Sequence, residues 1–196
     1  SMVAIRRYVE INAVGTATLL ECLAGPGVAV RKLIVASSMT VMGEGTYHCA
    51  SHGAVYPPLR SVGQLERGEW EVVCPACGAR TEPVAMVEQR PLQPTSIYGL
   101  TKRDQEEMCL LLGRAYRIPT VAFRYFSVYG PRQSLVNPYT GVIARFATRL
   151  MCGKPPLVFE DGQQRKDCVH VRDVVRANLL ALHGDGGDYE IFNIGS

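Results

Sequence analysis

A tyrosine and a lysine are spaced for acid–base chemistry near the expected start of a helix. Tyr98 and Lys102 are four residues apart, so they share one face of that helix. A free tyrosine has a pKa of about 10 and is a poor base at neutral pH, but a neighbouring ammonium group and the helix N-terminus favour its phenolate form. Tyr98 is therefore a candidate general base toward a substrate hydroxyl. The same spacing also occurs on amphipathic helices whose lysine is merely solvated.

Two serines follow a short apolar segment that has the character of a buried strand. Ser37 and Ser38 come directly after residues 33–36, which are apolar and β-rich enough to be covered on both faces. A side chain at the carboxyl end of a strand in an open α/β sheet points into the crevice where ligands bind. Ser38 is therefore placed to hydrogen-bond both the Tyr98 phenol and a reacting hydroxyl. The alternative is a serine that only caps a turn.

Four possible metal ligands lie in a polar stretch rich in glycine and proline. Cys49 and His52 form a C-x2-H pair, and Cys74 and Cys77 form a C-x2-C pair after 21 intervening residues. Three thiolates and an imidazole suit a closed tetrahedral zinc site. A glycine follows each pair, as the tight turn of a zinc knuckle requires. The spacing therefore predicts a small zinc-ribbon-like unit with a structural zinc ion.

The alternative interpretation treats Cys74 and Cys77 as a redox pair or as incidental thiols. No thioredoxin-like unit surrounds them, and Cys49 with His52 completes a second knuckle, so structural zinc is the preferred hypothesis, with His48 as a possible substitute for His52. The loop is too polar to have much core, so the metal would supply its folding free energy. A closed site leaves no ligand position for catalysis. The remaining cysteines lie in apolar patterns and are expected to be buried thiols: Cys22, Cys109, Cys152 and Cys168.

Alternating helix and strand patterns predict the fold class. Apolar periodicity predicts helices over 5–24, 97–116, 140–152 and 171–183, and strands over 33–37, 119–126, 157–159 and 189–194. Strands that alternate with helices favour an α/β architecture with a largely parallel sheet. Residues 43–91 break this pattern and are interpreted as an insertion, which leaves 1–42 and 92–196 as the core.

Composition excludes several classes of protein. The chain of 196 residues is 47% hydrophobic and 20% charged, which provides a core and argues against disorder. No apolar run reaches the length of about 18 residues that a membrane span needs, and the first residues lack the apolar stretch of a secretory signal. The net charge of +3 is small and spread out, so nucleic acid is not an expected partner. We expect a cytoplasmic protein.

Five sequence blocks in a fixed order resemble one enzyme family. They are Asn12–Thr16, Ala36–Val41, Tyr98–Lys102, Arg124–Gln133, and the region that contains Asp161–Asp167 and His170–Val174. Together they are similar to the NAD-dependent epimerase/dehydratase family of extended short-chain dehydrogenases/reductases, and most of all to its UDP-glucose 4-epimerase type. The resemblance implies a Rossmann-like parallel sheet with flanking helices, NAD as cofactor, a nucleotide-sugar substrate and a homodimer.

The resemblance also assigns residues. Ser38, Tyr98 and Lys102 correspond to the catalytic triad, in which Tyr98 takes the sugar hydroxyl proton and Lys102 lowers the tyrosine pKa and binds the nicotinamide ribose. Ser127 and Lys166 correspond to positions near the substrate diphosphate. The implied cofactor-binding residues are Asn12, Ala36, Ser37, Tyr98, Lys102 and Phe126, and the implied substrate-binding residues are Ser38, Thr40, Ser127, Arg165 and Lys166.

The residues after the serines bear on the type of reaction. Dehydratases of the family carry an acidic pair at the positions of Met39 and Thr40, and elimination needs such an additional acid or base. The expected function is therefore an NAD-dependent nucleotide-sugar epimerase that acts at C4 of a UDP- or other NDP-sugar through a transient keto intermediate. A dehydratase or reductase on the same fold, and a non-catalytic zinc-stabilised fragment that binds a partner, are the alternatives.

One family feature has no counterpart in this chain. The family begins with a strand and a G-x-x-G-x-x-G turn that places the cofactor pyrophosphate at a helix N-terminus, and that motif is absent here. We therefore expect an interior portion of a longer enzyme, without the N-terminal part of the sheet and nearly inactive alone. The insertion leaves the sheet near the active-site edge, so it is expected either to cover the sugar pocket or to contact a partner.

Overall fold

A three-stranded parallel sheet forms the centre of the computed structural model, which describes residues 2–135, 137 and 141–196. Its strands are β1 (Leu33–Ser38), β5 (Thr120–Tyr125) and β8 (Ile191–Ile194), in the order β1-β5-β8. The register pairs Ser38 with Tyr125, so the strands end together at one edge of the sheet. That edge is where the candidate catalytic serine lies.

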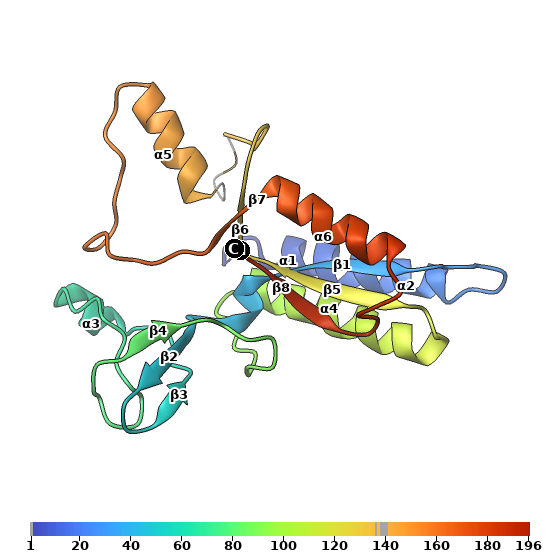
Figure 1. Cartoon of the computed structure of the whole chain (residues 1–196), viewed down its shortest axis with the longest axis horizontal. Coiled ribbons are helices and arrows are strands. Elements are labelled where there is room, and N and C mark those ends of the chain that lie inside the picture. Colours follow the sequence, from blue (N-terminus) through green and yellow to red (C-terminus); the bar gives the residue numbers. More distant parts are fainter. Residues whose placement is uncertain (1, 136, 138–140) are drawn as a thin grey trace.

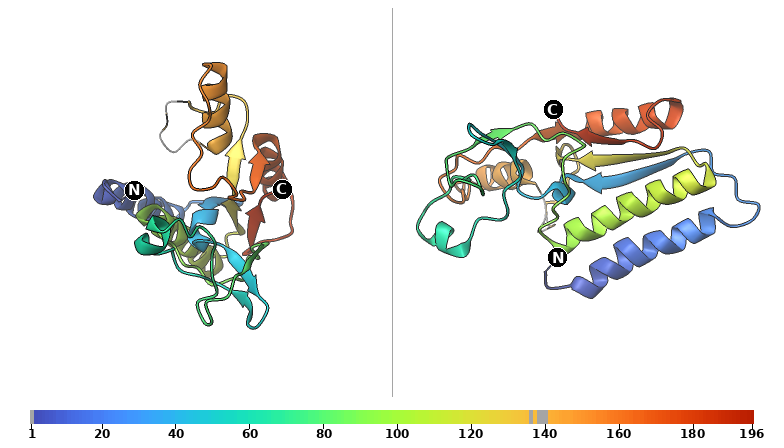
Figure 2. Two further views of the ribbon diagram at one scale, coloured as in Figure 1. Left: turned by 90° about the vertical axis from the view of Figure 1, so that its left-hand side faces the viewer. Right: turned by 90° about the horizontal axis from the view of Figure 1, so that it is seen from below.

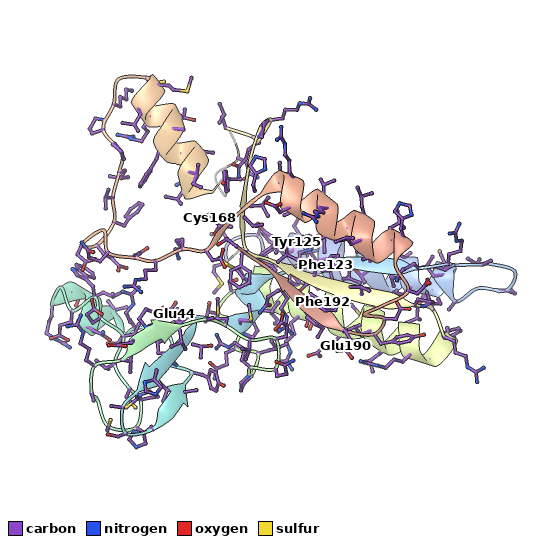
Figure 3. All side chains as sticks on the ribbon, viewed as in Figure 1. Glu44, Phe123, Tyr125, Cys168, Glu190 and Phe192 are labelled. Atoms are coloured by element: carbon purple, nitrogen blue, oxygen red, sulfur yellow. The ribbon has the colours of Figure 1, made fainter. Side chains whose placement is uncertain are left out.

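Aromatic side chains pack between the two later strands of the sheet. The ring centroids of Phe123 and Phe192 are 6.3 Å apart, and those of Phe123 and Tyr125 are 6.1 Å apart. Figure 3 shows these three rings gathered on β5 and β8. The Tyr125 hydroxyl also accepts a hydrogen bond of 2.8 Å from Asn178, which joins the sheet to the C-terminal helix.

Helices cover both faces of this sheet (Figure 2). One face carries α2 (Gly15–Leu23) and α4 (Ile97–Tyr116), and the other carries α6 (Val171–His183). This arrangement confirms the predicted Rossmann-like α/β architecture. In the part of the chain that the structure describes, no helix is both long and apolar enough to cross a bilayer. The core between α2, α4 and the sheet is formed by Leu20, Val35, Cys109, Leu110 and Ala122.

The first predicted helix is interrupted by a different helical turn. Residues 5–24 were expected to form one α-helix, but α1 (Ile5–Tyr8) and α2 are joined by a π-helical stretch, η1 (Val9–Val14). A π-helix makes i→i+5 hydrogen bonds and so takes in an additional residue per turn, a feature frequent at functional sites. Asn12, one of the predicted cofactor residues, lies in this stretch.

The predicted strand over residues 157–159 is wrong. Leu157, Val158 and Phe159 are 56%, 54% and 66% exposed, and no described strand lies beside them. Their apolar, β-rich composition gives them strand propensity, but a strand needs a hydrogen-bonding neighbour. The short strands β6 (Ser127–Tyr129) and β7 (Cys168–His170) pair with each other instead.

Most of the expected insertion lies beside the central sheet as a small antiparallel sheet with one short helix (Figure 1), while the Glu88 carbonyl near its end accepts a hydrogen bond from Arg124 of β5. The insertion contains β2 (Thr46–Cys49), β3 (Gly53–Val55), α3 (Val62–Glu66) and β4 (Glu82–Val84), with an antiparallel sheet in the order β3-β2-β4. Its buried cluster is limited to Cys49, Val55 and Cys74, with Tyr47 packed against them. At its stem, the Gln93 amide donates a hydrogen bond of 3.0 Å to the Val41 carbonyl and closes the excursion.

The expectation of four buried thiols outside the insertion is mostly wrong. Cys109 is buried in the core, and desolvation raises its pKa to about 11. Cys22 and Cys152 are exposed, and Cys168 is half-buried. The apolar neighbours of Cys22 and Cys152 in the sequence indicate helices. Cys22, however, is exposed on α2, and Cys152 is exposed directly after α5 (Val142–Met151).

An ion pair is buried between the sheet and α4. Arg124 and Glu106 are 2% and 1% exposed in their side chains, and the guanidinium donates bonds of 2.6 and 3.0 Å to the two carboxylate oxygens. Ser37 Oγ donates a third bond of 2.7 Å to Glu106. Arg124 also donates one of 2.8 Å to the Glu88 carbonyl. The charged groups are thus well supplied with partners, as burial requires.

We predict that Glu106→Gln lowers the free energy of unfolding by about 3–5 kcal/mol, because it leaves the buried Arg124 guanidinium without a counter-charge. The matched control is Glu107→Gln, which removes an ion pair with Arg103 that is 39% and 48% exposed in its side chains. That control should cost less than about 0.5 kcal/mol. Urea denaturation of both variants measures the difference, and equal losses would contradict the prediction.

Candidate active site and metal cluster

The predicted tyrosine and lysine lie in the first two turns of α4. The helix starts because Ser96 Oγ accepts a hydrogen bond of 3.0 Å from the Gly99 amide. Lys102 Nζ donates a bond of 2.9 Å to the Ala36 carbonyl and lies 6.0 Å from the ring centroid of Tyr98. Partial burial of the ammonium lowers the pKa of Lys102. The structure therefore brings Tyr98 and Lys102 together against β1.

Ser38 is held with its oxygen acting as an acceptor. Its Oγ accepts bonds of 3.2 Å from the Thr40 amide and 3.0 Å from Thr40 Oγ1. A hydroxyl oxygen accepts two hydrogen bonds and donates one. Both acceptor positions are used, so the remaining capacity of Ser38 is to donate its proton to a ligand or to the phenol. Thr40, predicted to bind substrate, thus orients the serine.

Gly99 allows the turn after Ser38 (Met39–Met42, the serine loop) to lie against the start of α4. A Cβ atom at this position would lie 2.7 Å from the Thr40 carbonyl oxygen and 3.2 Å from Cβ of Pro94. Only glycine allows the two backbones to approach so closely. This role was not predicted from the sequence, although a glycine directly after a candidate base, inside a helix where it costs stability, was a usable signal.

Asn12 reaches the active-site end of α4. Its Nδ2 donates a bond of 3.0 Å to Thr101 Oγ1, which itself donates one of 3.0 Å to the Tyr98 carbonyl. The ring of Tyr8 packs edge-on against the ring of Tyr98, with centroids 6.1 Å apart. The π-helical stretch therefore places Asn12 close to Tyr98, the candidate base. Asn12 was predicted to bind the cofactor.

The two serines point to opposite sides of β1. Neighbouring side chains alternate between the faces of a strand, so when Ser38 lies at the active-site edge, Ser37 turns inward and donates its proton to Glu106. A cofactor contact by Ser37 would therefore use its backbone. Ala36, the third predicted residue on this strand, is exposed, and its carbonyl accepts the Lys102 bond.

The predicted cofactor residue Phe126 and three of the predicted substrate residues lie on adjacent segments. Phe126 is half-buried, and its amide donates a bond of 3.1 Å to Ile194. The Ser127 amide donates one of 3.2 Å to the Asp167 carbonyl, directly after Arg165 and Lys166. These two cations are exposed.

An open cavity of roughly 800 Å³ lies between α5 and the segment 157–166. Its lining includes Lys166 but not Arg165. Apolar walls with a few charged groups are typical of ligand pockets. The lining combines apolar side chains, among them Phe146, Leu157 and Phe159, with the cations Arg145, Arg149 and Lys166.

The four predicted metal ligands converge in the insertion. Their ligand atoms all lie within 4.8 Å of one another. His52 Nδ1 is 3.6 Å from Sγ of both Cys49 and Cys74, and the sulfurs of Cys49 and Cys77 are 3.8 Å apart. Tetrahedral zinc with bonds of about 2.3 Å to sulfur and 2.0–2.1 Å to nitrogen requires separations of about 3.8 and 3.6 Å. His48, the possible substitute, is exposed on β2 and outside the cluster.

Two tight turns shape the cluster. The His52 amide donates a bond of 3.2 Å to the Cys49 carbonyl, and the Gly78 amide donates one of 2.8 Å to the Cys74 carbonyl. Gly53 and Gly78 adopt φ angles of +68° and +71°, which are unfavourable for other residues. The hydrogen bond with the His52 side chain lowers the pKa of Cys49 to about 6 and so favours the thiolate that binds metal.

A family comparison accounts for this geometry. The model of the NAD dependent epimerase/dehydratase family matches residues 74–195, which is more than half of the chain. The chain belongs to this family. The candidate catalytic side chains lie at the carboxyl edge of its parallel sheet, the edge at which open α/β sheets bind their ligands.

Similar members of the epimerase/dehydratase family act on nucleotide sugars. The dTDP-L-rhamnose 4-epimerase of Burkholderia thailandensis is 34% identical over 200 residues, covering all of this chain and 53% of that protein. The UDP-glucuronic acid 4-epimerase of Bacillus cereus, solved with NAD, has a TM-score of 0.71 at 27% identity, covering 99% of this chain and 50% of that one. The UDP-glucose 4-epimerase of Thermotoga maritima, solved with UDP-glucose, has a TM-score of 0.69 at 29% identity, covering 98% and 50%. The chain spans about half the length of these relatives.

We predict that Gly99→Ala destabilises the protein by about 1–3 kcal/mol, because the new methyl group would overlap the Thr40 carbonyl and force the serine loop away from α4. Gly63→Ala is the control, since a Cβ there meets nothing closer than Arg67 at 3.6 Å. This second change replaces a glycine in α3 and should stabilise by up to about 1 kcal/mol. Denaturant unfolding compares the signs, and a stabilising Gly99→Ala would refute the close approach.

Proposed function

We propose that the protein is an NAD-dependent nucleotide-sugar epimerase that inverts C4 of a UDP-, dTDP- or related NDP-sugar. The observation that carries this proposal is the packing of the start of α4, with Tyr98 and Lys102, against the end of β1 that carries Ser38. It is supported by relatives that are themselves nucleotide-sugar 4-epimerases.

The residues at this edge fit a nicotinamide cofactor. Lys102 uses one of its three ammonium protons on Ala36, and the same ammonium lies at the sheet edge where dinucleotides bind. Lys102 would bind the nicotinamide ribose, and Asn12 and Phe126 would line the cofactor. When bound, NAD supplies the chemistry of taking a hydride from the sugar carbon and returning it.

The chain's own side chains handle the proton and the orientation of the sugar. Tyr98 is the group that takes the proton of the sugar hydroxyl and later returns it. Ser38, whose oxygen already accepts two bonds from Thr40, donates its proton toward the reacting oxygen. Ser127, Arg165 and Lys166 would bind the diphosphate, which leaves the sugar near Tyr98.

The absence of acids next to Ser38 favours epimerisation over dehydration. Met39 cannot transfer a proton, and the Thr40 hydroxyl is engaged with Ser38. Elimination of water from the sugar would need a second acid or base at this place. Inversion at C4 needs only the one proton-transferring group and rotation of the keto sugar.

We also propose that Cys49, His52, Cys74 and Cys77 bind one structural zinc ion. The ligand separations of 3.6 and 3.8 Å suit a tetrahedral site with three thiolates and one imidazole. A closed site of this kind stabilises its surroundings and has no coordination position for a substrate. The small buried cluster of the insertion makes such a cross-link necessary for its folding.

The homodimer and the cytoplasmic location stay predictions from the sequence. The dimer would use α4, whose outer side exposes Leu100, Leu111 and Tyr116 by 44%, 66% and 57%. Apolar side chains at such exposure are compatible with a helix that packs against its mate.

We predict that Tyr98→Phe lowers turnover by about 10²–10⁴-fold, because it removes the proton-transferring group and leaves the ring in place. UDP-glucose, UDP-glucuronic acid and dTDP-L-rhamnose are the substrates to compare, with the 4-epimers detected by NMR. Tyr116→Phe, at the exposed end of the same helix, is the control. Undiminished turnover in Tyr98→Phe would reject this base, and a 4-keto-6-deoxy product would assign the protein to the dehydratases.

We predict about one zinc ion per chain in the purified protein, measured by elemental analysis, and its loss in Cys74→Ser. Cys152→Ser, which changes an exposed cysteine outside the cluster, should keep the metal. Loss of zinc should also make residues 43–91 sensitive to protease, since their core is small. A metal-free native protein would contradict the proposed site.

A further inference from the structure

The cavity beside α5, whose lining includes the proposed diphosphate-binding residue Lys166, has one wall without regular structure. Phe159, Gly162, Gln164 and Lys166 all line the cavity, yet residues 157–166 form neither helix nor strand. Glu160 lies in the middle of this wall with a φ of +55°, a left-handed conformation that costs free energy for any residue but glycine. Such a segment needs partners from elsewhere in the fold to keep its shape.

The main partner of Glu160 comes from the insertion. Arg60 donates bonds of 2.9 and 3.1 Å to its two carboxylate oxygens, across 100 residues of sequence. The two side chains are 19% and 18% exposed, so the pair is largely shielded from water. The Glu160 hydrogen bond raises the pKa of Arg60, and the pKa of Glu160 is lowered in turn. Figure 1 shows the loop after α5 passing next to the insertion near α3.

Arg60 is itself fixed inside the insertion. Its Nη1 also donates a bond of 2.8 Å to the Trp70 carbonyl, and its Nε lies 4.0 Å from a Glu44 oxygen. The chain between Arg60 and Trp70 is cross-linked by Gln64, whose Nε2 donates bonds of 3.0 and 2.9 Å to the carbonyls of Glu69 and Glu71. Cys74 of the metal cluster follows three residues after Glu71, so the cluster holds the next part of the same chain.

We propose that Arg60 is a positioning residue for the sugar nucleotide: it connects the metal-stabilised insertion to Glu160 and thereby fixes the cavity wall that carries Lys166. The side chain of Gln164, which lines the cavity, lies close enough to Glu160 to contribute to lowering the pKa of that carboxyl. The order of contacts is therefore Arg60 to Glu160 to Gln164. This inference rests on the proposed epimerase function, and it gives the insertion a role in substrate binding without any contact between its metal and the substrate.

The same insertion offers a matched control. Arg67 pairs with Glu69 through two bonds of 2.8 and 2.7 Å, a fork as well formed as that of Arg60. This pair joins residues two apart in the chain and is 62% and 54% exposed in its side chains. Removing it alters the charge of the insertion equally but leaves the cavity wall untouched.

The test compares Arg60→Ala with Arg67→Ala in the NAD-loaded protein. We expect Arg60→Ala to raise KM for the sugar nucleotide about tenfold, as loss of a shielded bidentate ion pair implies, with kcat changed by less than about twofold. Glu160→Gln, which leaves the insertion itself unchanged, should give the same rise. Arg67→Ala should leave both constants unaltered. An unchanged KM in Arg60→Ala or in Glu160→Gln would overturn the proposal.

A double-mutant cycle shows whether Arg60 acts through Glu160. Arg60→Ala added to Glu160→Gln should raise KM no further, because the contact is already lost. Removal of zinc through Cys74→Ser should raise KM similarly and also add nothing to Glu160→Gln. A second full rise in the double variant would show that Arg60 acts by another route and would refute the inference.

Hydrogen–deuterium exchange separates this inference from the proposed function. Amides of residues 157–166 should exchange faster in Arg60→Ala and in the zinc-free protein, but at the native rate in Arg67→Ala. If the full-length native protein converts no sugar nucleotide, the epimerase proposal fails, while the exchange rates still decide whether Arg60 orders the wall. Native exchange rates in Arg60→Ala would overturn the positioning role.

Discussion

The buried ion pair between Arg124 and Glu106 is the interaction on which the arrangement of the site depends. It joins the central strand β5 to α4. Ser37 of β1 donates a hydrogen bond to Glu106, and Arg124 donates one to the Glu88 carbonyl at the end of the insertion. Glu106 lies four residues after Lys102, which lies four after Tyr98, so all three share one face of α4. A charge that is costly to leave unpaired therefore fixes the rotation of the helix, and the two reactive side chains follow.

The sequence was informative where function depends on short spacings. The Tyr98–Lys102 pair, the serine at the end of a strand and the two knuckles are local patterns, and the helices over 97–116 and 171–183 match their predicted bounds. It was uninformative where the outcome depends on a distant partner. The partner of Arg124, the π-helical turn, the fate of residues 157–159 and the exposure of Cys22 are all decided by what lies opposite in the fold, which periodicity does not encode.

Different interactions stabilise the core and the insertion. The core buries apolar residues from α2, α4 and the sheet around one compensated charge pair. The insertion has three buried residues in its cluster and relies on a set of converging thiols and an imidazole. Small units of this kind commonly need a metal because they cannot bury enough apolar surface. With the proposed zinc bound, chelators or oxidants would act on the insertion, whereas denaturants act on the core.

The hydrogen bond between Gln93 and Val41 has a consequence for the history of such enzymes. It joins the two ends of the insertion beside the serine loop, so the chain between these two residues leaves the core and returns to it at one place. Lengthening a closed loop costs little free energy. Evolution could therefore replace the outer part of this insertion, altering which sugar is preferred, while Glu88 and the charged groups that it supports stay as they are. Substrate range and chemical step would then diversify independently in one gene.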